Sequence, residues 1–548
     1  MDAPLALLIC LLAVPAVAND GKPRSCSSVR QFYIDKGFSQ SWVPRIKISG
    51  EHLRICPQGY TCCVSEMEES LWNMSQREFK GQVRDLGHAL QASLSTLYGN
   101  FDGYFAELLN RSEGLLQDWL GSTPGELYAE GAAVSRELYT DLRRYHRGSG
   151  VNLEEALNDF WPRLLERLFR VWGLQEPTTG DFLECLAKQM EALRPFGDAP
   201  RDLRLRVKRV FVAVRSFVQG LSVSHDVVHK VSQVPLSSEC TRAIMKMTYC
   251  PQCHGIASIK PCANYCRNVM KGCLANQADL QPEWSNLIFA LLQMATRFIS
   301  GDSRLDVSIF SIPQHISDGI MNMQENRDIF TSKVSQACGS PQVRSTHSTR
   351  PEEAKKPGTT LDSKVPNILA ARLEGQMSQV NSKLTEKQSY WVQLPEVLCG
   401  DKEEPSISKD KCWNGMTKGR YLPEEMGDGL ANQINNPEVE MDITKPDMNV
   451  RQQIMQLKIM TSRLKNAFDG NDVDFQDASD DISGSGSGAC IEEHCPRGDP
   501  CILAPRTDRP GPYAYTPEKK APAKDTGSQG PPSTPPLLLS LAVLLLWR

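Results

Sequence analysis

The sequence predicts an all-α fold: a helical core large enough to bury a continuous interior, followed by an extended stalk. Apolar residues recur at steps of three and four in several long stretches, which places them on one face of a helix. No run of alternating apolar and polar residues with turn signals stands out, so strands are not expected. After Phe468 the composition changes to acidic, Ser-Gly and proline-rich sequence, which is typical of a solvated stalk.

Four apolar stripes locate the main predicted helices of the core. Within the second stripe, Pro162 fits best in a first helical turn capped from Asn158 or Asp159, where its missing N–H costs nothing. The stripes are Val83, Leu86, Leu90, Leu94 and Leu97; Leu157, Trp161, Leu164, Leu165, Leu168 and Trp172; Leu203, Val207, Val210, Phe211, Val214, Phe217, Val218 and Leu221; and Ile454, Leu457, Leu464 and Phe468.

Residues 1–18 have the pattern of a secretory signal peptide. Leu5 to Val14 is almost wholly apolar and too short to span a bilayer, and Ala16-Val17-Ala18 has the small-x-small pattern that signal peptidase recognises. The segment departs from the usual pattern because no Lys or Arg precedes the apolar run. We expect secretion with cleavage after Ala18, rather than a buried N-terminal helix.

The other end of the sequence resembles a signal for a glycosylphosphatidylinositol (GPI) anchor. Leu537 to Trp547 is apolar apart from Ser540, and a helix of this length spans roughly 16 Å, about half of a hydrocarbon core. A polar, proline-rich spacer precedes this tail, and small residues precede the spacer. Asp525 fits best as the attachment residue and Ser528 almost as well; the alternative is a frayed apolar C-terminus.

Three consecutive Ser-Gly units form the central chemical motif of the stalk. Ser483, Ser485 and Ser487 are each followed by glycine, which leaves room for a sugar transferase, and five aspartates between positions 472 and 481 lead into them. A plain Gly-Ser linker needs no acidic lead-in. We therefore expect all three serines to carry glycosaminoglycan chains. Two sequons, at Asn73 and Asn110, are expected to carry N-linked glycans.

Charge and cysteine content exclude a nucleic-acid-binding polycation and favour disulfides over a zinc site. The chain has 61 basic and 65 acidic residues, so the polypeptide is not a polycation for nucleic acid. Of its 18 cysteines, 14 lie between Cys26 and Cys412, and in a secreted chain they should form disulfides rather than a zinc site. Cys62 and Cys63 are adjacent, so each needs a distant partner.

No constellation of catalytic residues emerges from the sequence. His225 and His229 have the spacing of a zinc-protease helix, but the residue between them that would be the general base is an aspartate and no third ligand is evident. The basic run from Arg206 to Arg209 lies within an apolar stripe and is expected on a solvated helical face. We expect no enzyme activity, no catalytic residue, no metal and no cofactor.

The expected organisation follows from these segments. Residues 1–18 are a signal peptide and 19–470 a disulfide-rich helical core, interrupted by a disordered loop over 339–366 that is rich in Ser, Thr, Pro and charge. Residues 471–528 form the attachment region and stalk. Residues 529–548 are an anchor signal that is removed on maturation.

Three blocks of sequence have a familiar pattern. The first has Cys250, Cys253-His254-Gly255-Ile256, Pro261-Cys262, Tyr265-Cys266, Val269 and Gly272-Cys273; the second is His52 to Cys63; the third runs from Asp428 to Lys458. These blocks resemble the glypican family, and the type-1 subgroup most of all. The resemblance extends from the signal peptide through the Ser-Gly repeat. Beyond the repeat the stalk diverges, and the pairing of Cys490, Cys495 and Cys501 stays open.

The resemblance implies an elongated, single-domain helical core in which the 14 core cysteines form seven disulfides. It also implies heparan sulfate chains. The implied pairs are Cys26–Cys62, Cys56–Cys250, Cys63–Cys253, Cys185–Cys338, Cys240–Cys273, Cys262–Cys412 and Cys266–Cys399.

The predicted function is that of a GPI-anchored proteoglycan on the extracellular side of the plasma membrane, with a shed form also allowed. As in the family that it resembles, its heparan sulfate should bind and present heparin-binding growth factors and morphogens of the fibroblast growth factor, Wnt and Hedgehog classes, as a co-receptor. The polyanionic chains would gather basic proteins electrostatically. The alternative is a protein that binds ligands through its helical core, independently of the sugar chains.

Overall fold

The computed structural model describes residues 25–56, 59–122, 126–171, 180–301, 304–339, 365–400 and 411–475. The chain divides into two units, Met1–Ala478 and Ser479–Arg548, and the second lies wholly outside the described residues. The signal peptide, the Ser-Gly repeat, the anchor residues, the stalk cysteines and most of the predicted loop over 339–366 also lie outside them.

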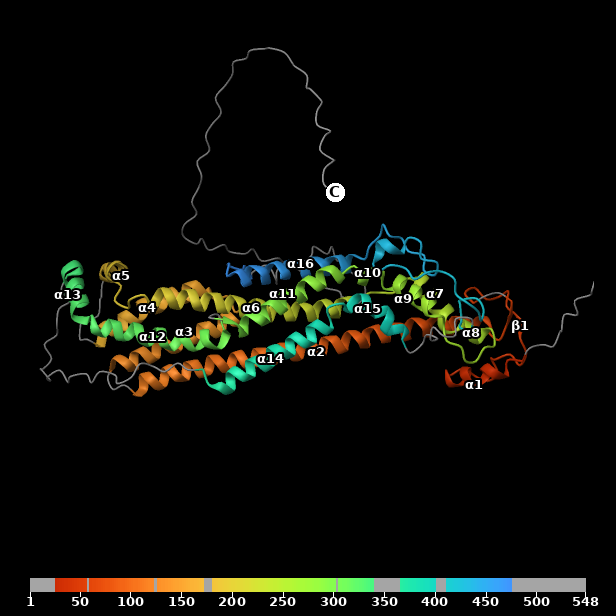
Figure 1. Cartoon of the computed structure of the whole chain (residues 1–548), viewed down its shortest axis with the longest axis horizontal. Helices are drawn as coiled ribbons and strands as arrows, with labels where there is room; N and C mark the ends of the chain where they lie inside the picture. Colours follow the sequence, from red (N-terminus) through yellow and green to blue (C-terminus); the bar gives the residue numbers. More distant parts are fainter. Residues whose placement is uncertain are drawn as a thin grey trace, which may run out of the picture. The chain divides into compact units, whose positions relative to one another are not determined.

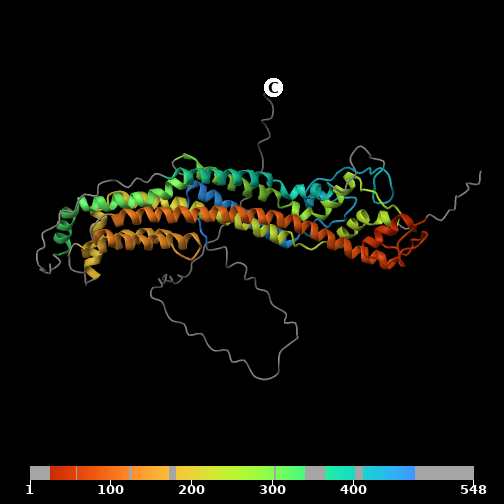
Figure 2. The same ribbon diagram turned by 90° about the horizontal axis from the view of Figure 1, so that it is seen from below.

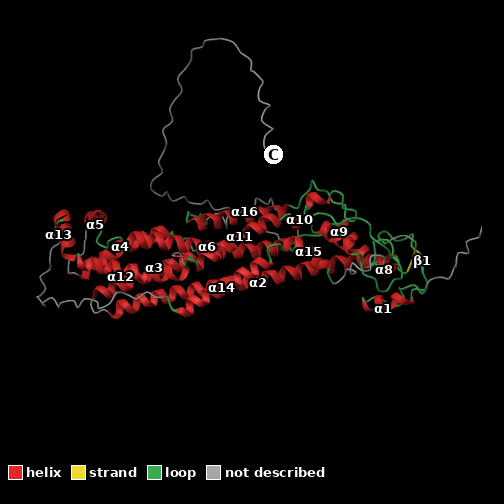
Figure 3. Ribbon diagram, viewed as in Figure 1, coloured by secondary structure: helices red, strands yellow, loops and turns green. Residues whose placement is uncertain are grey.

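The described residues are mostly helical, with two short strands among them, which confirms the all-α prediction (Figure 3). The elements are α1 Ser27–Asp35, β1 Ile48–Ser49, β2 Tyr60–Thr61, α2 Ser65–Ser122, α3 Glu126–His146, α4 Leu153–Val171, α5 Gly180–Leu193, α6 Ala199–Val231, α7 Ser238–Thr248, α8 Cys250–Cys253, α9 Ala263–Cys273, α10 Ala275–Ala278, α11 Gln281–Ile299, α12 Leu305–Glu325, α13 Arg327–Cys338, α14 Asn367–Glu386, α15 Tyr390–Cys399, the short 3-10 helix η3 Leu430–Gln433, and α16 Met448–Asp469.

Helix α2 is the longest element, and its 58 residues correspond to about 87 Å of α-helix. It packs against α3, α6, α7, α12 and α14, and these helices lie side by side with it in two perpendicular views (Figures 1 and 2). Leu90, Leu94 and Leu97 of the first predicted stripe are buried, while Val83 and Leu86 are half-buried. The stripe therefore marks the face of α2 that meets the other helices.

Helix α6 forms the middle of the helical core. It packs against α2, α4, α11, α12 and α16, so residues on more than one of its faces are buried. Phe217 lies 4.8 Å from Phe101 of α2 and 5.4 Å from Phe298 of α11, measured between ring centroids. At Gly220 an added Cβ would lie 2.9 Å from Leu291, so glycine allows α11 to approach this closely. These contacts join three segments that are far apart in the sequence.

The structure corrects the prediction for Pro162. Helix α4 begins at Leu153, where the Asn152 side chain accepts hydrogen bonds from the backbone N–H groups of Glu154 and Glu155. Pro162 lies inside this helix rather than in its first turn. The helix continues through the proline because Trp161, Leu164 and the other described residues of the stripe are buried on both sides of it, and packing outweighs the lost hydrogen bond.

Helix α16 has termini that the sequence specifies well. The Asp447 side chain accepts a hydrogen bond from the backbone N–H of Val450, and Gly470 ends the helix with a left-handed φ of 85°. Ile454, Leu457 and Leu464 of the fourth stripe are buried, and Phe468 is partly buried against the core. The two residues of β1 pair with β2 in an antiparallel ladder that the sequence analysis did not predict.

Candidate functional site

The predicted attachment serines, Ser483, Ser485 and Ser487, and the candidate anchor residues, Asp525 and Ser528, lie outside the described residues. The described chain brings together two other parts of the predicted site. One is the cysteine-rich end of the core, which contains the family-like motifs. The other is the segment after α16 that leads towards the serines.

Three disulfides tie the N-terminal segment to the turn around α8. Cys26 is bonded to Cys62, Cys56 to Cys250, and Cys63 to Cys253. The adjacent cysteines therefore reach two different partners, as the strain argument predicts. Close by, the backbone N–H of Cys62 donates to the carbonyl oxygen of Cys253 at 2.7 Å. The N-terminal segment is thus held to α8 by covalent bonds and by backbone hydrogen bonding.

Four further disulfides connect other parts of the core. Together with the first three, they are the seven pairs that the sequence resemblance implies. One of these cysteines, Cys240, lies in the first turn of α7, where the side chain of Ser237 caps the helix by accepting a hydrogen bond from the backbone N–H of Cys240 at 3.1 Å. The four pairs are Cys185–Cys338, Cys240–Cys273, Cys262–Cys412 and Cys266–Cys399.

The buried carboxylate of Glu68 organises the segment before Cys56, and the sequence analysis missed this residue. Glu68 is 5% exposed, and its two oxygens accept hydrogen bonds from the backbone N–H groups of Arg54, Ile55 and Cys56 at 2.8–2.9 Å. A carboxylate that satisfies three backbone donors fixes their path. A signal was available, since Glu68 falls in the first turn of a helix directly after two cysteines.

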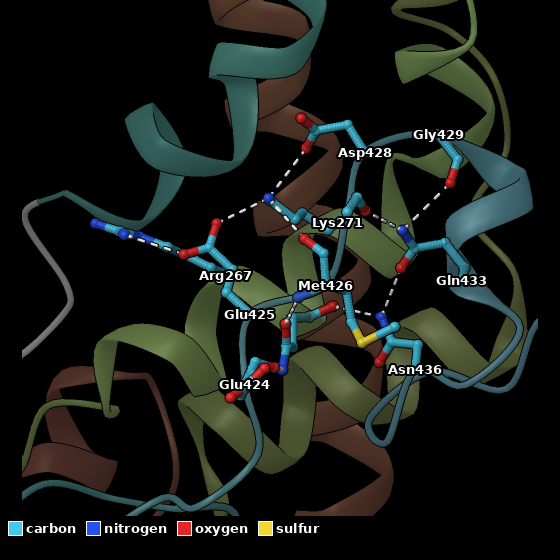
Figure 4. Close-up of polar contacts among 11 residues, drawn as sticks. Arg267, Lys271, Glu424, Glu425, Met426, Asp428, Gly429, Gln433 and Asn436 are labelled. Carbon is cyan, nitrogen blue, oxygen red and sulfur yellow. Dashed lines mark hydrogen bonds and ion pairs between the residues drawn. The ribbon is translucent and has the colours of Figure 1, made fainter. Parts of the chain in front are cut away.

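A polar network anchors the segment after Cys412 to α9 (Figure 4). The ammonium group of Lys271 lies 2.8 Å from Glu425 and 3.1 Å from Asp428, and donates to the carbonyl oxygen of Met426 at 2.8 Å. Burial alone would lower the pKa of Lys271, but its hydrogen bonds to Glu425 and Asp428 raise it. Burial would raise the pKa of Glu425, yet Lys271 and Arg267 together lower it. The charged forms of both partners are therefore stabilised.

Amide side chains extend this network through the backbone. Asn268 donates to the carbonyl oxygen of Glu424 and accepts from the N–H of Met426, both at 2.8 Å. Asn436 donates to the carbonyl oxygen of Asn268 at 2.9 Å, and Gln433 donates to that of Gly427 at 2.7 Å. The third family-like block and the residues just before it are thus fixed to the first block by partly buried polar contacts. This arrangement holds a fold together and contains no nucleophile paired with a base.

The remaining sequence candidates lie on helical surfaces. His225 contacts Asp226 within α6, and His229 of the same helix contacts Gln233, which lies just after the helix ends. Within the described ranges, no group of three or more His, Cys, Asp or Glu side chains is arranged to hold a metal ion. No helix within these ranges has both the length and the apolarity needed to cross a bilayer.

Both sequon asparagines are exposed on α2. The side-chain oxygen of Asn110 accepts a hydrogen bond from Arg143 at 2.9 Å, so its nitrogen, the atom that would carry the sugar, is not used in this contact. The serines of the two sequons, Ser75 and Ser112, are buried. Occupancy at Asn73 and Asn110 stays a prediction.

The residues that follow α16 lie against α6. Lys208 of α6 forms ion pairs of 2.9 Å with both Glu154 and Asp472. The guanidinium group of Arg215 lies 4.2 Å from the ring centroid of Phe475, the last described residue. The first residues of the acidic segment, up to Phe475, are therefore held against α6.

Comparisons with known proteins agree with the fold and with the motifs. The glypican family model matches residues 7–547. Glypican-1 of Gallus gallus is 52% identical over 550 residues, which cover 99% of this chain and 98% of that protein. A crystal structure of C-terminally truncated glypican-1 matches with a TM-score of 0.74 and 53% identity, covering 82% of this chain and all of that one.

A more distant structure, Dally-like protein in complex with O-palmitoleoyl serine, matches with a TM-score of 0.61 and 28% identity, over 82% of this chain and 99% of that chain. The sequence prediction, a glypican most similar to the type-1 subgroup, is confirmed by the family model and by the glypican-1 relatives. With the helical core and the family motifs in place, the chain belongs to the glypican family.

Proposed function

We propose that this glypican core protein carries heparan sulfate at Ser483, Ser485 and Ser487, and that these chains gather basic growth factors and morphogens at the cell surface. The observation that carries the proposal is the acidic run followed by three Ser-Gly units. The proposed role is binding and presentation, without catalysis. A GPI anchor at Asp525 or Ser528 would keep the chains on the outer leaflet.

The physical basis of this function is electrostatic. Each sulfated disaccharide carries on the order of two negative charges, so a long chain far exceeds the formal charge of −4 of the polypeptide. Binding of basic proteins would release counterions and would weaken as the salt concentration rises. Fibroblast growth factors and the Wnt and Hedgehog classes are the proposed ligands.

The test is capture of a basic fibroblast growth factor by cells that express the chain. Heparan lyase treatment, or the triple substitution of Ser483, Ser485 and Ser487 by alanine, should abolish capture. The single variant Ser479→Ala, in the same acidic segment but without a following glycine, is the matched control and should capture normally. Undiminished capture after lyase treatment would contradict the proposed mechanism.

A second candidate function is direct ligand binding by the helical core. A cleft of about 470 Å³ lies between α4, α5 and α6, with Leu157, Trp161, Met190 and Phe196 among its lining residues. This volume is within the range of ligand pockets. The Dally-like relative was solved with O-palmitoleoyl serine, so an acyl chain is the ligand that we propose for this cleft.

The experiment for the second function uses the serine-to-alanine triple variant and a fluorescent palmitoleoylated serine peptide. Met190→Glu places a charge in the cleft and should weaken binding at least tenfold. Met448→Glu, at an exposed position on α16, should not. Equal binding by both variants would exclude this cleft as the site.

A further inference from the structure

A cleft of about 610 Å³ lies beside the start of the stalk, and most of the charged residues that line it are basic. It is formed by the first half of α6, the end of α11, the start of α12 and the residues that follow α16. Four basic residues line it, against a single acidic one. The basic residues are Arg206, Lys208, Arg209 and Arg297, and the acidic one is Asp472.

The cationic groups of this cleft are only partly neutralised by the protein. Lys208 is paired with Glu154 and Asp472. Among the described residues, no carboxylate forms an ion pair with the guanidinium group of Arg206, Arg209 or Arg297. An anion that entered the cleft would therefore meet three guanidinium groups without ion-pair partners.

Arg209 lies close enough to Arg297 to disfavour the charged form of Arg297. Burial lowers the pKa of Arg297, Arg209 lowers it further, and Asp469 opposes the effect only in part. The guanidinium group of Arg209 lies against Gly470, where an added Cβ would be 3.1 Å from Nε. The chain thus holds two like charges near each other at the point where it leaves α16. A bound anion would relieve this repulsion.

The lining residues indicate which kind of anion fits. Guanidinium groups bind sulfate and carboxylate groups through two parallel hydrogen bonds, and the apolar side chains of Leu205, Phe298 and Leu305 complete the wall. A sulfated sugar offers both features, since charged substituents project from the less polar faces of its rings. A volume of about 610 Å³ is sufficient for a short oligosaccharide.

The short stretch of sequence between the cleft and Ser483 indicates the source of this ligand. Ser483 is eleven residues after Asp472, so the covalent chain limits their separation to about 40 Å. A glycosaminoglycan attached at Ser483 would be present at the cleft at a high effective concentration, in the millimolar range for short flexible connections. Sugar from solution would have to compete with it.

We propose that this cleft binds a sulfated segment of the heparan sulfate chain that the same polypeptide carries at Ser483, Ser485 or Ser487. The inference rests on the proposed function, because it requires a chain at these serines. The bound segment holds the first part of the polysaccharide along α6, and the remainder extends into solution to bind ligands.

The first experiment measures the affinity of the cleft for a sulfated sugar, with a heparin hexasaccharide as probe. The protein is the full chain with Ser483, Ser485 and Ser487 replaced by alanine, titrated by calorimetry at several salt concentrations. R209Q/R297Q should weaken binding at least tenfold and reduce the salt slope by about two. The control R84Q/K333Q changes charge equally at exposed positions away from the cleft and should bind normally.

If R209Q/R297Q lowers the melting temperature, R206E replaces it, because Arg206 is exposed and its replacement should leave the core intact. R206E should also weaken hexasaccharide binding at least tenfold. Equal affinities of the cleft variants and the control would overturn the proposal.

The second experiment tests whether the cleft is filled by the protein's own chain. Phenylglyoxal, a neutral reagent that modifies arginine, is applied to the chain-bearing protein and to the serine-to-alanine triple variant, and modification is located by peptide mass spectrometry. Arg209 and Arg297 should react at least threefold more slowly in the chain-bearing protein, whereas Arg84 should react equally in both.

Equal modification of Arg209 and Arg297 in the two proteins would overturn binding in cis, even if the hexasaccharide binds from solution. The same mass spectrometry reports whether the three serines carry glycosaminoglycan. An absence of chains there would refute the proposed function, and hexasaccharide binding by the triple variant would still measure the cleft independently.

Discussion

At the scale of single residues, a few buried polar side chains fix segments that lack regular structure. Glu68 holds the backbone before Cys56, and Lys271 holds the segment around Glu425. Neither contact follows from hydrophobic periodicity. In both cases a charged side chain is partnered by several groups, which is the condition under which burying a charge is tolerated.

The first prediction concerns Glu68. Replacement by alanine leaves three backbone N–H groups without their charged acceptor, and the free energy of unfolding should fall by about 3 kcal/mol. Urea denaturation of the full chain measures the change. Glu69→Ala, one residue away and exposed, should leave the denaturation midpoint unchanged. Similar midpoints for the two variants would contradict a structural role for the Glu68 carboxylate.

The second prediction concerns Lys271 and pH. Lys271→Gln should lower the free energy of unfolding by about 2 kcal/mol near pH 7, because Glu425 and Asp428 lose their shared cation. The folded-state pKa of Glu425 is lowered, so its contribution is present above its unfolded pKa and is lost as pH falls through the folded value. The folded-state pKa of Lys271 is raised, so its contribution persists below its unfolded pKa and disappears at strongly alkaline pH.

The difference in stability between wild type and Lys271→Gln should therefore be constant from about pH 5 to 10 and shrink below about pH 4. Denaturation midpoints across this range provide the measurement. Lys445→Gln, at a position exposed to solvent, is the control and should show a much smaller difference. If the difference in stability between wild type and Lys271→Gln increased on acidification, a stabilising ion pair between Lys271 and Glu425 would be contradicted.

At the scale of elements, two disulfides close almost the same loop. Cys56–Cys250 spans 194 residues and Cys63–Cys253 spans 190. While one of them is present, the other closes only the short additional loop between the two cross-links. The entropy that each removes from the unfolded chain therefore depends on whether the other is intact.

The third prediction is that the contributions of these two disulfides to the free energy of unfolding are not additive. Replacing both cysteines of one pair by serine should cost about 3 kcal/mol, since only the short loop opens. Replacing all four should cost about 8 kcal/mol, because the loop of 194 residues then opens as well. Denaturation of the three variants measures the costs, with secretion yield as a second readout.

The single variant Cys56→Ser leaves Cys250 unpaired and should be retained or aggregate in the secretory pathway. Normal secretion of this variant with an unchanged melting temperature would count against the importance of the pair. A fourfold variant that loses no more than the sum of the two pairs would show that the nested-loop account is wrong.

At the scale of the whole molecule, the described core and the stalk sequence differ in how much apolar surface they can bury. The core is a single network of buried helices cross-linked by disulfides. The stalk sequence has little apolar surface to bury, apart from the last residues of the tail. Changes at the end of the chain should therefore alter where the protein resides without altering how the core folds.

The fourth prediction concerns the C-terminal tail. If residues 529–548 are exchanged for a lipid anchor, phosphatidylinositol-specific phospholipase should release the protein from intact cells. Val543→Asp should block anchoring, because a charge in the tail opposes its burial in the membrane. Ala523→Asp, upstream of both candidate anchor residues, is the control and should remain anchored. Flow cytometry before and after phospholipase treatment measures both.

A protein truncated before Pro531 should be secreted with its glycosaminoglycan chains, because Ser483, Ser485 and Ser487 precede the cut. Surface protein that resists the phospholipase, with tail peptides recovered from the mature form, would show that the tail is retained.

The sequence by itself determined the all-α class, the buried faces of α2, α6 and α16, and the family, because helical periodicity and cysteine spacing are local patterns. It misplaced Pro162, whose position inside α4 depends on how strongly the neighbouring apolar residues are buried. Glu68, the network around Lys271 and the basic cleft beside Gly470 became visible only in the tertiary structure. The Lys271 network and the cleft join residues from distant parts of the chain, and Glu68 bonds to backbone groups of an irregular segment 12–14 residues before it. Hydrophobic periodicity does not record which polar groups folding brings together in any of these cases.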